Sequence, residues 1–334
     1  MYEDYLVTVM EVIHQVSKQY DIEVRLILSI NRTHSVQNAQ DTLQLALKYC
    51  ANTGAPRGTN NHMIVGLDFS GNPSIQNAQF RKFESIFKQA RQAQLKITLH
   101  FAEIYDPQDT DDILAFGPDR VGHACCLSPG QWQQLQEKQI PIEICFTSNI
   151  ITRPELHSHC VCCMKKVQVK TIDNTSTTQR SRLHEHIISQ IFEERVSSSS
   201  AAATASTKCP QFCRMCSFHS VDEMLYSRQV YDSLDCLCGY TVHPLRTLCQ
   251  QKPSSVMNSY HPICICTDDP GVFATSSSLE YYRITMACQL SKQHILQMAE
   301  SSILMIFDTT MIEQLQRQLN AFQQSNSIDE LLAN

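Results

Sequence analysis

The stretch KITLHFAE, residues 96–103, joins a short apolar run to a histidine and, three residues later, a glutamate. The run from Leu95 to Leu99 has the length and composition of a strand buried in a core. His100 and Glu103 then fall where that strand would leave the core. A polar pair at such a point indicates a functional site if other strands of the chain end in the same way.

Up to about Pro154 the sequence alternates regularly between apolar strands and helices. We expect strands at 24–30, 63–71, 96–103, 119–124 and 141–149, with helices at 3–19, 37–50, 75–93 and 129–138. The strands show no polar alternation, which is typical of parallel strands covered on both faces, as in a barrel or a doubly wound sheet. After residue 258 we expect one more strand and loop at 261–276, followed by helices near 277–289, 292–303 and 308–322.

Each predicted strand finishes in polar residues. They are Asn31; Asp68, Ser70 and Gly71; His100 and Glu103; His123; Thr147, Ser148 and Asn149; and Thr267, Asp268 and Asp269. In a parallel barrel the carboxyl ends of all strands open onto one face, so these residues should converge. A single histidine at a strand end is usually a hydrogen-bonded core residue, and TDDP alone is a plausible turn. Only the recurrence at successive strands favours a functional reading.

The residue types at these ends suit metal-assisted hydrolysis. Histidine and aspartate are good ligands for zinc, and a bound metal lowers the pKa of its water. A nearby glutamate can donate a proton to the group under attack, and a second histidine can orient the water. The cytidine-deaminase pattern, His-x-Glu with Pro-Cys-x-x-Cys, does not occur, because the Cys-x-x-Cys of Cys213 and Cys216 follows Phe212.

Four motifs in order, LHFAE, DRVGHA, PIEICFTSN and ICTDDPGVFAT, resemble those of the adenosine and AMP deaminase family. The resemblance covers roughly 3–153 and 260–322. VGLDFSGNP and LEYY are more narrowly similar to members that act on N(6)-methyl-AMP. The resemblance implies a (β/α)8 TIM-type barrel, one catalytic zinc per chain, and hydrolytic release of methylamine from the purine nucleotide N(6)-methyl-AMP to give IMP.

The resemblance also implies a role for each matching residue. His100 and Asp268 would be zinc ligands, Glu103 the proton donor, and His123 the residue that orients and polarises the water. Asp269 and the backbone at Gly71 would hold the purine ring. Asn31 stands where nucleotide-directed members tend to have an aspartate, and we assign it to substrate binding.

Two features depart from the family pattern at the start of the chain. The family opens with a strand ending in His-x-His, which supplies two zinc ligands, and this strand and the next have no counterpart here. We therefore expect six strands of the eight and a weaker zinc site. An alternative hypothesis follows, a catalytically dead homologue that binds nucleotide or a partner without turnover. HSH (157–159) and HEH (184–186) have the right spacing, but both follow the seventh family strand, and HEH lies in a helical pattern.

The sequence predicts a division of the chain into three parts. Residues 1–154 carry family strands three to seven, 155–258 form a low-complexity, Cys-rich insertion, and 259–325 carry the last strand and the C-terminal helices. The stretch CPQFCRMC (209–216), with Cys209, Cys213 and Cys216, could form a small zinc knuckle together with Cys236 and Cys238, which leaves a third hypothesis of a metal-binding interaction module. We favour a long disordered insertion, because few apolar residues surround these cysteines.

Composition excludes several other classes of protein. The net charge of −6 without a basic block argues against nucleic acid as a partner, and no apolar run approaches the roughly 20 residues of a membrane span. The acidic start lacks a cleavage site for secretion, so we expect a cytoplasmic protein and a monomer. Its 16 cysteines should then be thiols or metal ligands rather than disulfides.

Overall fold

The fold is described here by a computed structural model, which covers residues 2–20, 22–50, 63–152, 243–249 and 261–324. The chain divides into two compact units, and all of these residues belong to the unit made of 1–153 and 240–334. Its centre is a sheet of six parallel strands whose order in space equals their order in sequence. The strands are β1 (Leu26–Asn31), β2 (Ile64–Ser70), β3 (Lys96–Phe101), β4 (Arg120–His123), β5 (Ile142–Ile144) and β6 (Ile263–Ile265).

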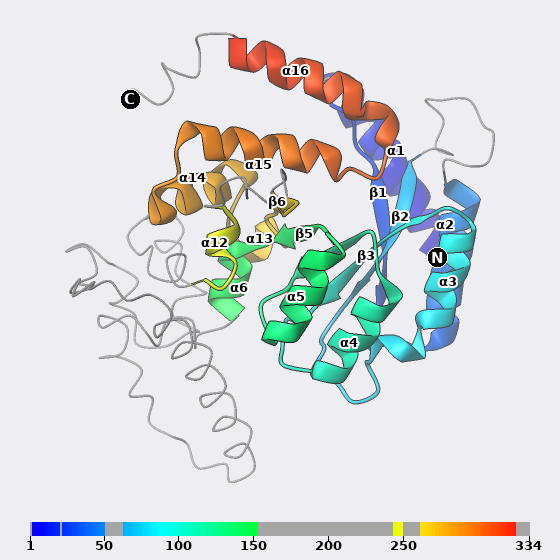
Figure 1. The fold of residues 1–334 in the computed structure, drawn as a ribbon. Coiled ribbons are helices and arrows are strands. Elements are labelled where there is room, and N and C mark those ends of the chain that lie inside the picture. The colour runs from blue at the N-terminus through cyan, green and yellow to red at the C-terminus, as the bar shows by residue number, and fades with distance from the viewer. Residues whose placement is uncertain (1, 21, 51–62, 153–242, 250–260, 325–334) are drawn as a thin grey trace. The chain divides into compact units, whose positions relative to one another are not determined.

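Helices connect successive strands and pack on the sheet, with α2 and α3 side by side (Figure 1). In the first part of the chain they are α1 (Tyr2–Tyr20), α2 (Val36–Tyr49), the 3-10 turn η3 (Phe80–Lys82), α3 (Glu84–Gln92), α4 (Pro107–Phe116), α5 (Pro129–Glu137) and α6 (Phe146–Thr152). Later they are α12 (Arg246–Cys249), α13 (Pro270–Phe273), α14 (Ser277–Cys288), α15 (Lys292–Leu304), η6 (Thr309–Met311) and α16 (Ile312–Gln324). The predicted α/β fold with six parallel strands is confirmed, and all carboxyl ends lie at one edge of the sheet.

Local sequence signals set the ends of several helices. Ser128 and Gln131 form a reciprocal capping box at the start of α5, with Pro129 at its first turn. The Asp106 carboxylate accepts a hydrogen bond from the Asp109 amide at the start of α4. Gly117 ends α4 in a left-handed conformation, with φ of +66°. These caps fix the start and the end of α4 and the start of α5, the two helices that precede and follow β4 in the sequence.

Aromatic side chains form the core beneath the ends of β2 and β3. Phe69 on β2 lies with its ring centroid 5.3–5.8 Å from three rings of the following turn and helix, Phe80, Phe83 and Phe87. The Arg32 guanidinium lies 4.5 Å above Phe69 and donates to the His100 carbonyl oxygen at 3.0 Å. Asp109 pairs with Arg32 at 3.3 Å and also accepts from the Phe80 amide at 2.6 Å. This buried core therefore fixes the backbone of His100.

The structure corrects two predicted element boundaries. The strand expected over 141–149 ends at Ile144, and Thr147, Ser148 and Asn149 lie on helix α6 instead. The cause is tertiary: the fully buried Glu280 carboxylate accepts hydrogen bonds from the amide and the hydroxyl of Thr147. The helix expected from residue 75 begins only with η3 and α3, because Asn77 has a positive φ of 63° and the Phe80 amide donates to Asp109.

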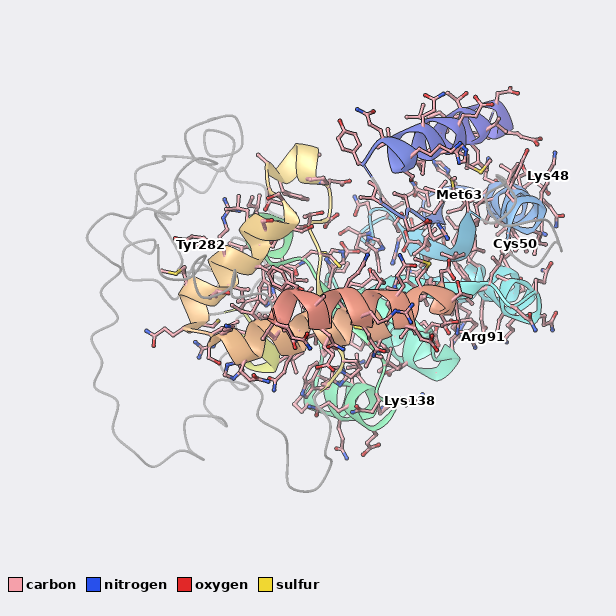
Figure 2. The ribbon with its side chains drawn as sticks, turned by 90° about the horizontal axis from the view of Figure 1, so that it is seen from above. Lys48, Cys50, Met63, Arg91, Lys138 and Tyr282 are labelled. Atoms are coloured by element: carbon pink, nitrogen blue, oxygen red, sulfur yellow. The ribbon has the colours of Figure 1, made fainter. Side chains whose placement is uncertain are left out.

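The segment between α15 and η6 lies at the amino-terminal ends of β1 and β4. Helices α15 and α16 lie side by side, and the exposed Lys48, Arg91 and Lys138 lie on the outside of the molecule (Figure 2). Arg25, just before β1, pairs with Asp308 at 2.8 Å, and Arg120 of β4 donates to the Met305 carbonyl oxygen at 2.7 Å. The segment between α15 and η6 is thus joined to the starts of β1 and β4 by one ion pair and one hydrogen bond.

Several predicted features lie outside the described residues. These are HSH (157–159), HEH (184–186) and the five cysteines of the possible zinc knuckle. Of the predicted insertion 155–258, the structure describes residues 243–249, which include the buried His243, Leu245 and Leu248. Among the helices that the structure describes, none is long and apolar enough to cross a bilayer.

Candidate active site

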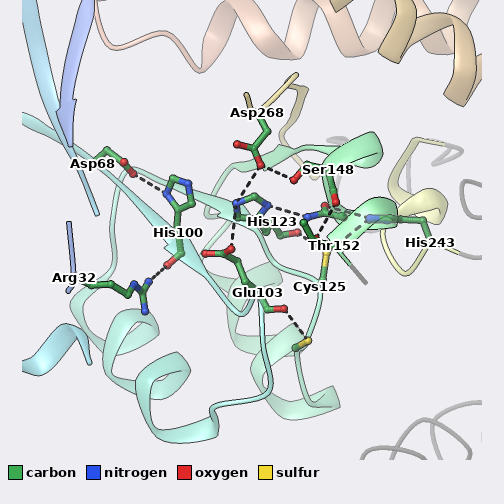
Figure 3. A network of polar contacts seen from close by, with 12 residues as sticks. Arg32, Asp68, His100, Glu103, His123, Cys125, Ser148, Thr152, His243 and Asp268 are labelled. Atoms are coloured by element: carbon green, nitrogen blue, oxygen red, sulfur yellow. Dashed lines mark hydrogen bonds and ion pairs between the residues drawn. The ribbon is translucent and has the colours of Figure 1, made fainter. Parts of the chain in front are cut away.

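The carboxyl ends of β3, β4 and β6 bring four of the predicted site residues together (Figure 3). The His100 and His123 rings have their centroids 5.0 Å apart. Nε2 of His123 lies 3.9 Å from Oε2 of Glu103 and 4.0 Å from Oδ2 of Asp268. The convergence predicted for His100, Glu103, His123 and Asp268 is therefore present, although these residues come from distant parts of the sequence.

The His100 imidazole faces a carboxylate-rich environment. Its Nδ1 lies 3.0 Å from Oδ1 of Asp68, whose other oxygen accepts a hydrogen bond from Ser29 at 2.7 Å. Burial alone would lower the pKa of His100, but the hydrogen bond with Asp68 and the negative charges of Asp68, Glu103 and Asp268 raise it to about 9. The field at this position favours a positive charge, whether a proton or a metal ion.

The His123 imidazole has a different environment, although the two rings are neighbours. Its side chain is only 4% exposed, and Nδ1 lies 2.9 Å from Nδ2 of Asn149 on α6. Burial lowers the pKa of His123, and the carboxylates of Glu103 and Asp268 oppose this shift without cancelling it. The neutral imidazole is therefore the favoured form near pH 7.

The backbone adopts left-handed conformations where the strands leave the sheet at this site. Ala102, His123, Ala124 and Asp268 have φ between +48° and +65°. Such conformations cost a non-glycine residue about 1–3 kcal/mol, and they cluster at functional sites. At Asp268 the Ser148 hydroxyl holds the side chain by donating to Oδ2 at 2.6 Å.

Three more predicted site residues lie at the same edge of the sheet. Asn31 and Gly71 are neighbours at the ends of β1 and β2, and a side chain at Gly71, where φ is +97°, would collide with the Asn31 carboxamide oxygen. Asn31 accepts hydrogen bonds from the amide and hydroxyl of Thr33. Asp269 is exposed at the start of α13, beside Asp268. The predicted substrate-binding residues thus flank the four central side chains on both sides.

The donor atoms at the strand ends fit a zinc ion. Because Nδ1 of His100 donates to Asp68, Nε2 is left to bind a metal, which is the usual arrangement of a carboxylate behind a metal-binding histidine. Asp268 supplies a carboxylate, and Oε1 of Glu103 is buried with no hydrogen-bond partner among the described residues. His123, Cys145 and Asp268 also place one potential ligand atom each within 4.8 Å of one another. Nitrogen and oxygen ligands of this kind are those that zinc prefers in catalytic sites.

Sequence reasoning did not assign roles to three residues that shape the site. Asp68 lies on the same face of β2 as Ser70, and the alternation of Asp68 and Ser70 with Leu67 and Phe69 signals a polar inner face. Asn149 was expected at a strand end, and helix α6 brings it to His123. No periodic pattern marks His243, whose position depends on tertiary packing alone.

Comparison with known proteins gives consistent matches. The model of the adenosine deaminase family matches residues 2–186. The chain is 38% identical over 159 residues to the adenosine deaminase-like protein of Drosophila melanogaster, covering 47% of this chain and 44% of that protein. It is 37% identical over 132 residues to the N6-mAMP deaminase of Arabidopsis thaliana, covering 40% of this chain and 34% of that protein.

Solved structures agree with the sequence matches. A crystal structure of Arabidopsis N6-mAMP deaminase is similar with a TM-score of 0.55 and 25% identity, covering 90% of this chain and 60% of that one. The structure of the ADAL–IMP complex is similar with the same TM-score and identity, covering 90% and 58% of the two chains. The chain thus spans less than half the length of these two sequence relatives and about three fifths of the solved chains.

Proposed function

This chain belongs to the adenosine deaminase family, and we propose that it is a hydrolytic deaminase that converts N(6)-methyl-AMP and water to IMP and methylamine. The observation that carries the proposal is the convergence of Glu103, His123, His100 and Asp268 at the strand ends. The similarity to N6-mAMP deaminase and to a structure in complex with IMP supports a purine nucleotide as the substrate.

In this reaction water adds at carbon six of the purine and the C6–N bond breaks. Glu103 would donate a proton to the purine as the water oxygen adds. The neutral His123 would orient and polarise that water through Nε2, which faces the space between Glu103 and Asp268. Asp269, the backbone at Gly71, and Asn31 would hold the nucleotide at the rim of the site. The attacking water would lose two protons, one replacing the proton that Glu103 gives to the purine ring and the other going to the departing nitrogen, so methylamine would leave neutral and Glu103 would be protonated again.

We also propose one zinc per chain, held by His100 and Asp268. Bound zinc would supply a Lewis acid that lowers the pKa of water at neutral pH. Asp68 would orient His100 by accepting the hydrogen bond from Nδ1. The proposed compartment is the cytoplasm, and a monomer is the proposed state.

The test measures methylamine and IMP released from N(6)-methyl-AMP by the purified full chain with added zinc. We expect Glu103→Gln to lower kcat by about 10²–10⁴-fold, the range for loss of a general acid. Glu137→Gln is the matched control, because Glu137 lies exposed on α5 and the same chemical change should leave the rate unaltered. N(6)-methyladenosine, tested in parallel, separates a nucleotide from a nucleoside preference.

Two outcomes would contradict the proposal. One is a wild-type chain that binds zinc and N(6)-methyl-AMP but releases no methylamine. The other is a Glu103→Gln chain that turns over at the wild-type rate, which would remove Glu103 from the reaction.

A further inference from the structure

A chain of three polar contacts runs from His123 through Asn149 and His243 to the backbone of Leu245, and Figure 3 labels the two histidines. Nδ1 of His123 lies 2.9 Å from Nδ2 of Asn149, and Oδ1 of Asn149 lies 3.3 Å from Nε2 of His243. Nδ1 of His243 then accepts the backbone N–H of Leu245 at 3.1 Å. His123, Asn149 and His243 are 3%, 3% and 1% exposed, so water does not compete for these contacts.

The last contact fixes the direction of every hydrogen bond in this chain. A backbone N–H can only donate, so Nδ1 of His243 carries a lone pair, and its ring proton must sit on Nε2. That proton is donated to Oδ1 of Asn149, and Cys125 Sγ lies 3.8 Å away as a weak second partner. Asn149 is thereby oriented so that its amide nitrogen donates to Nδ1 of His123. Nδ1 of His123 then has no proton, and Nε2 carries it.

The proton on Nε2 points toward the reacting groups. Nε2 of His123 is 3.9 Å from Glu103 and 4.0 Å from Asp268, too far for direct hydrogen bonds and close enough for one oxygen atom beside the three groups to contact all of them. A protonated Nε2 cannot bind a metal ion. This tautomer therefore assigns His123 a donor role rather than a place among the ligands with Cys145 and Asp268.

We propose that Asn149 and His243 are positioning residues that hold His123 as the neutral tautomer protonated at Nε2, so that it donates to the oxygen atom that attacks the substrate. This inference deepens the proposed function and rests on it for the identity of that oxygen. The tautomer itself follows from the three contacts and is measurable without turnover.

The test records the histidine side-chain nitrogens of the ¹⁵N-labelled full chain by long-range ¹H–¹⁵N correlation NMR. The His123 signals are identified by their loss in His123→Gln. We expect a protonated Nε2 and an unprotonated Nδ1 in the wild type. In Asn149→Asp the new carboxylate can only accept, so a proton should appear on Nδ1 of His123. Asn320→Asp, at an exposed position on α16, adds the same charge and should leave the His123 tautomer unchanged.

A second pair of variants keeps the test decisive if Asn149→Asp fails to fold. Gln at position 243 can accept from Leu245 and donate to Asn149, whereas Leu can do neither. We expect His243→Gln to keep the wild-type tautomer and His243→Leu to lose it. A wrong tautomer at a catalytic histidine lowers kcat by up to about 10⁴-fold, so kcat should fall in His243→Leu by about tenfold or more, with KM little changed.

Three outcomes separate the inference from the proposed function. A His123 proton on Nδ1 in the wild type, or an unchanged tautomer in both Asn149→Asp and His243→Leu, would overturn the inference. The predicted tautomers in a wild-type chain that releases no methylamine would uphold the positioning role and reject the deaminase.

Discussion

The strand ends of β1–β3 and those of β4–β6 carry one central histidine each, and the two histidines behave in opposite ways. At β3, His100 contacts the Asp68 carboxylate and has its pKa raised to about 9. At β4, His123 contacts the Asn149 amide in a more deeply buried position, and its pKa is lowered. The rings are only 5.0 Å apart, so the difference comes from their immediate surroundings: burial lowers the pKa of His123, whereas the Asp68 hydrogen bond and the nearby carboxylates raise that of His100.

The comparison shows how one sheet edge can serve two chemical roles. A histidine backed by a carboxylate presents a basic nitrogen to the site and suits a cation. A buried histidine backed by an amide stays neutral and has its tautomer set by hydrogen bonds. The Asp68–His100 pair therefore favours a positive charge at the end of β3, and the Asn149–His123 pair favours a directed hydrogen bond at the end of β4.

The largest expected effect is an opposite pH dependence of stability at the two histidines in metal-free protein. The folded pKa of His100, about 9, exceeds the unfolded value of 6.5, so its stabilisation is complete below pH 6.5 and is lost as the pH rises through 9. At about 1.4 kcal/mol per pKa unit this is on the order of 3 kcal/mol. For His123 the folded pKa is lower than the unfolded one, so stability is lost as the pH falls below 6.5.

Urea unfolding of the chelator-treated chain between pH 5 and 10 measures both effects. The free-energy difference between wild type and His100→Gln should shrink from pH 7 to pH 10. The corresponding difference for His123→Gln should shrink from pH 7 to pH 5. Free-energy differences that stay constant from pH 5 to pH 10 would show that the pKa values of the two histidines are not shifted in opposite directions.

A somewhat smaller effect is expected when the carboxylate behind His100 is replaced. Asp68→Asn should weaken zinc binding by about 10–100-fold, the range for loss of a hydrogen-bonded partner behind a metal ligand. Ser29→Ala is the control, because it removes one hydrogen bond to Asp68 and leaves the contact of Asp68 with His100. Calorimetric zinc titration measures the zinc affinity of the wild type and of both variants. Equal zinc affinities in the wild type and Asp68→Asn would show that Asp68 does not support His100 as a zinc ligand.

The smallest expected effect is a loss of stability when Gly71, at the end of β2 beside the end of β1, is replaced by alanine. Gly71 and Gly117 both have positive φ, but only at Gly71 would an added Cβ meet a neighbour, the Asn31 side chain. Ala in the left-handed region costs roughly 1–2 kcal/mol. Gly71→Ala should therefore lower the free energy of unfolding by more than Gly117→Ala does. Equal losses in urea unfolding would mean that the Asn31 side chain moves aside freely.

The sequence alone predicted the residues whose positions depend on regular structure. Short apolar strands alternating with helices predicted His100, Glu103, His123 and Asp268 at strand ends, and parallel strands bring such ends together. Asp68 was predicted only as one of the polar residues at a strand end, and its contact with His100 could not be inferred from one strand.

The remaining site residues depend on contacts between distant parts of the chain. Helix α6 replaces a predicted strand end because Thr147 binds the buried Glu280, which is 133 residues away. His243 lies in a stretch without hydrophobic periodicity, and only the Asn149 contact reveals its role. Local sequence patterns carry no information on the contact of Thr147 with Glu280 or on that of Asn149 with His243.

The measurement that tests the central claim most directly is calorimetric zinc titration of the chelator-treated full chain beside His100→Ala and Asp268→Ala. The account predicts that each variant loses one equivalent of zinc that the wild type binds. The double variant Cys213→Ser with Cys216→Ser should keep that equivalent. Loss of it in the cysteine variant alone, or equal zinc binding in wild type, His100→Ala and Asp268→Ala, would contradict a zinc site at the strand ends.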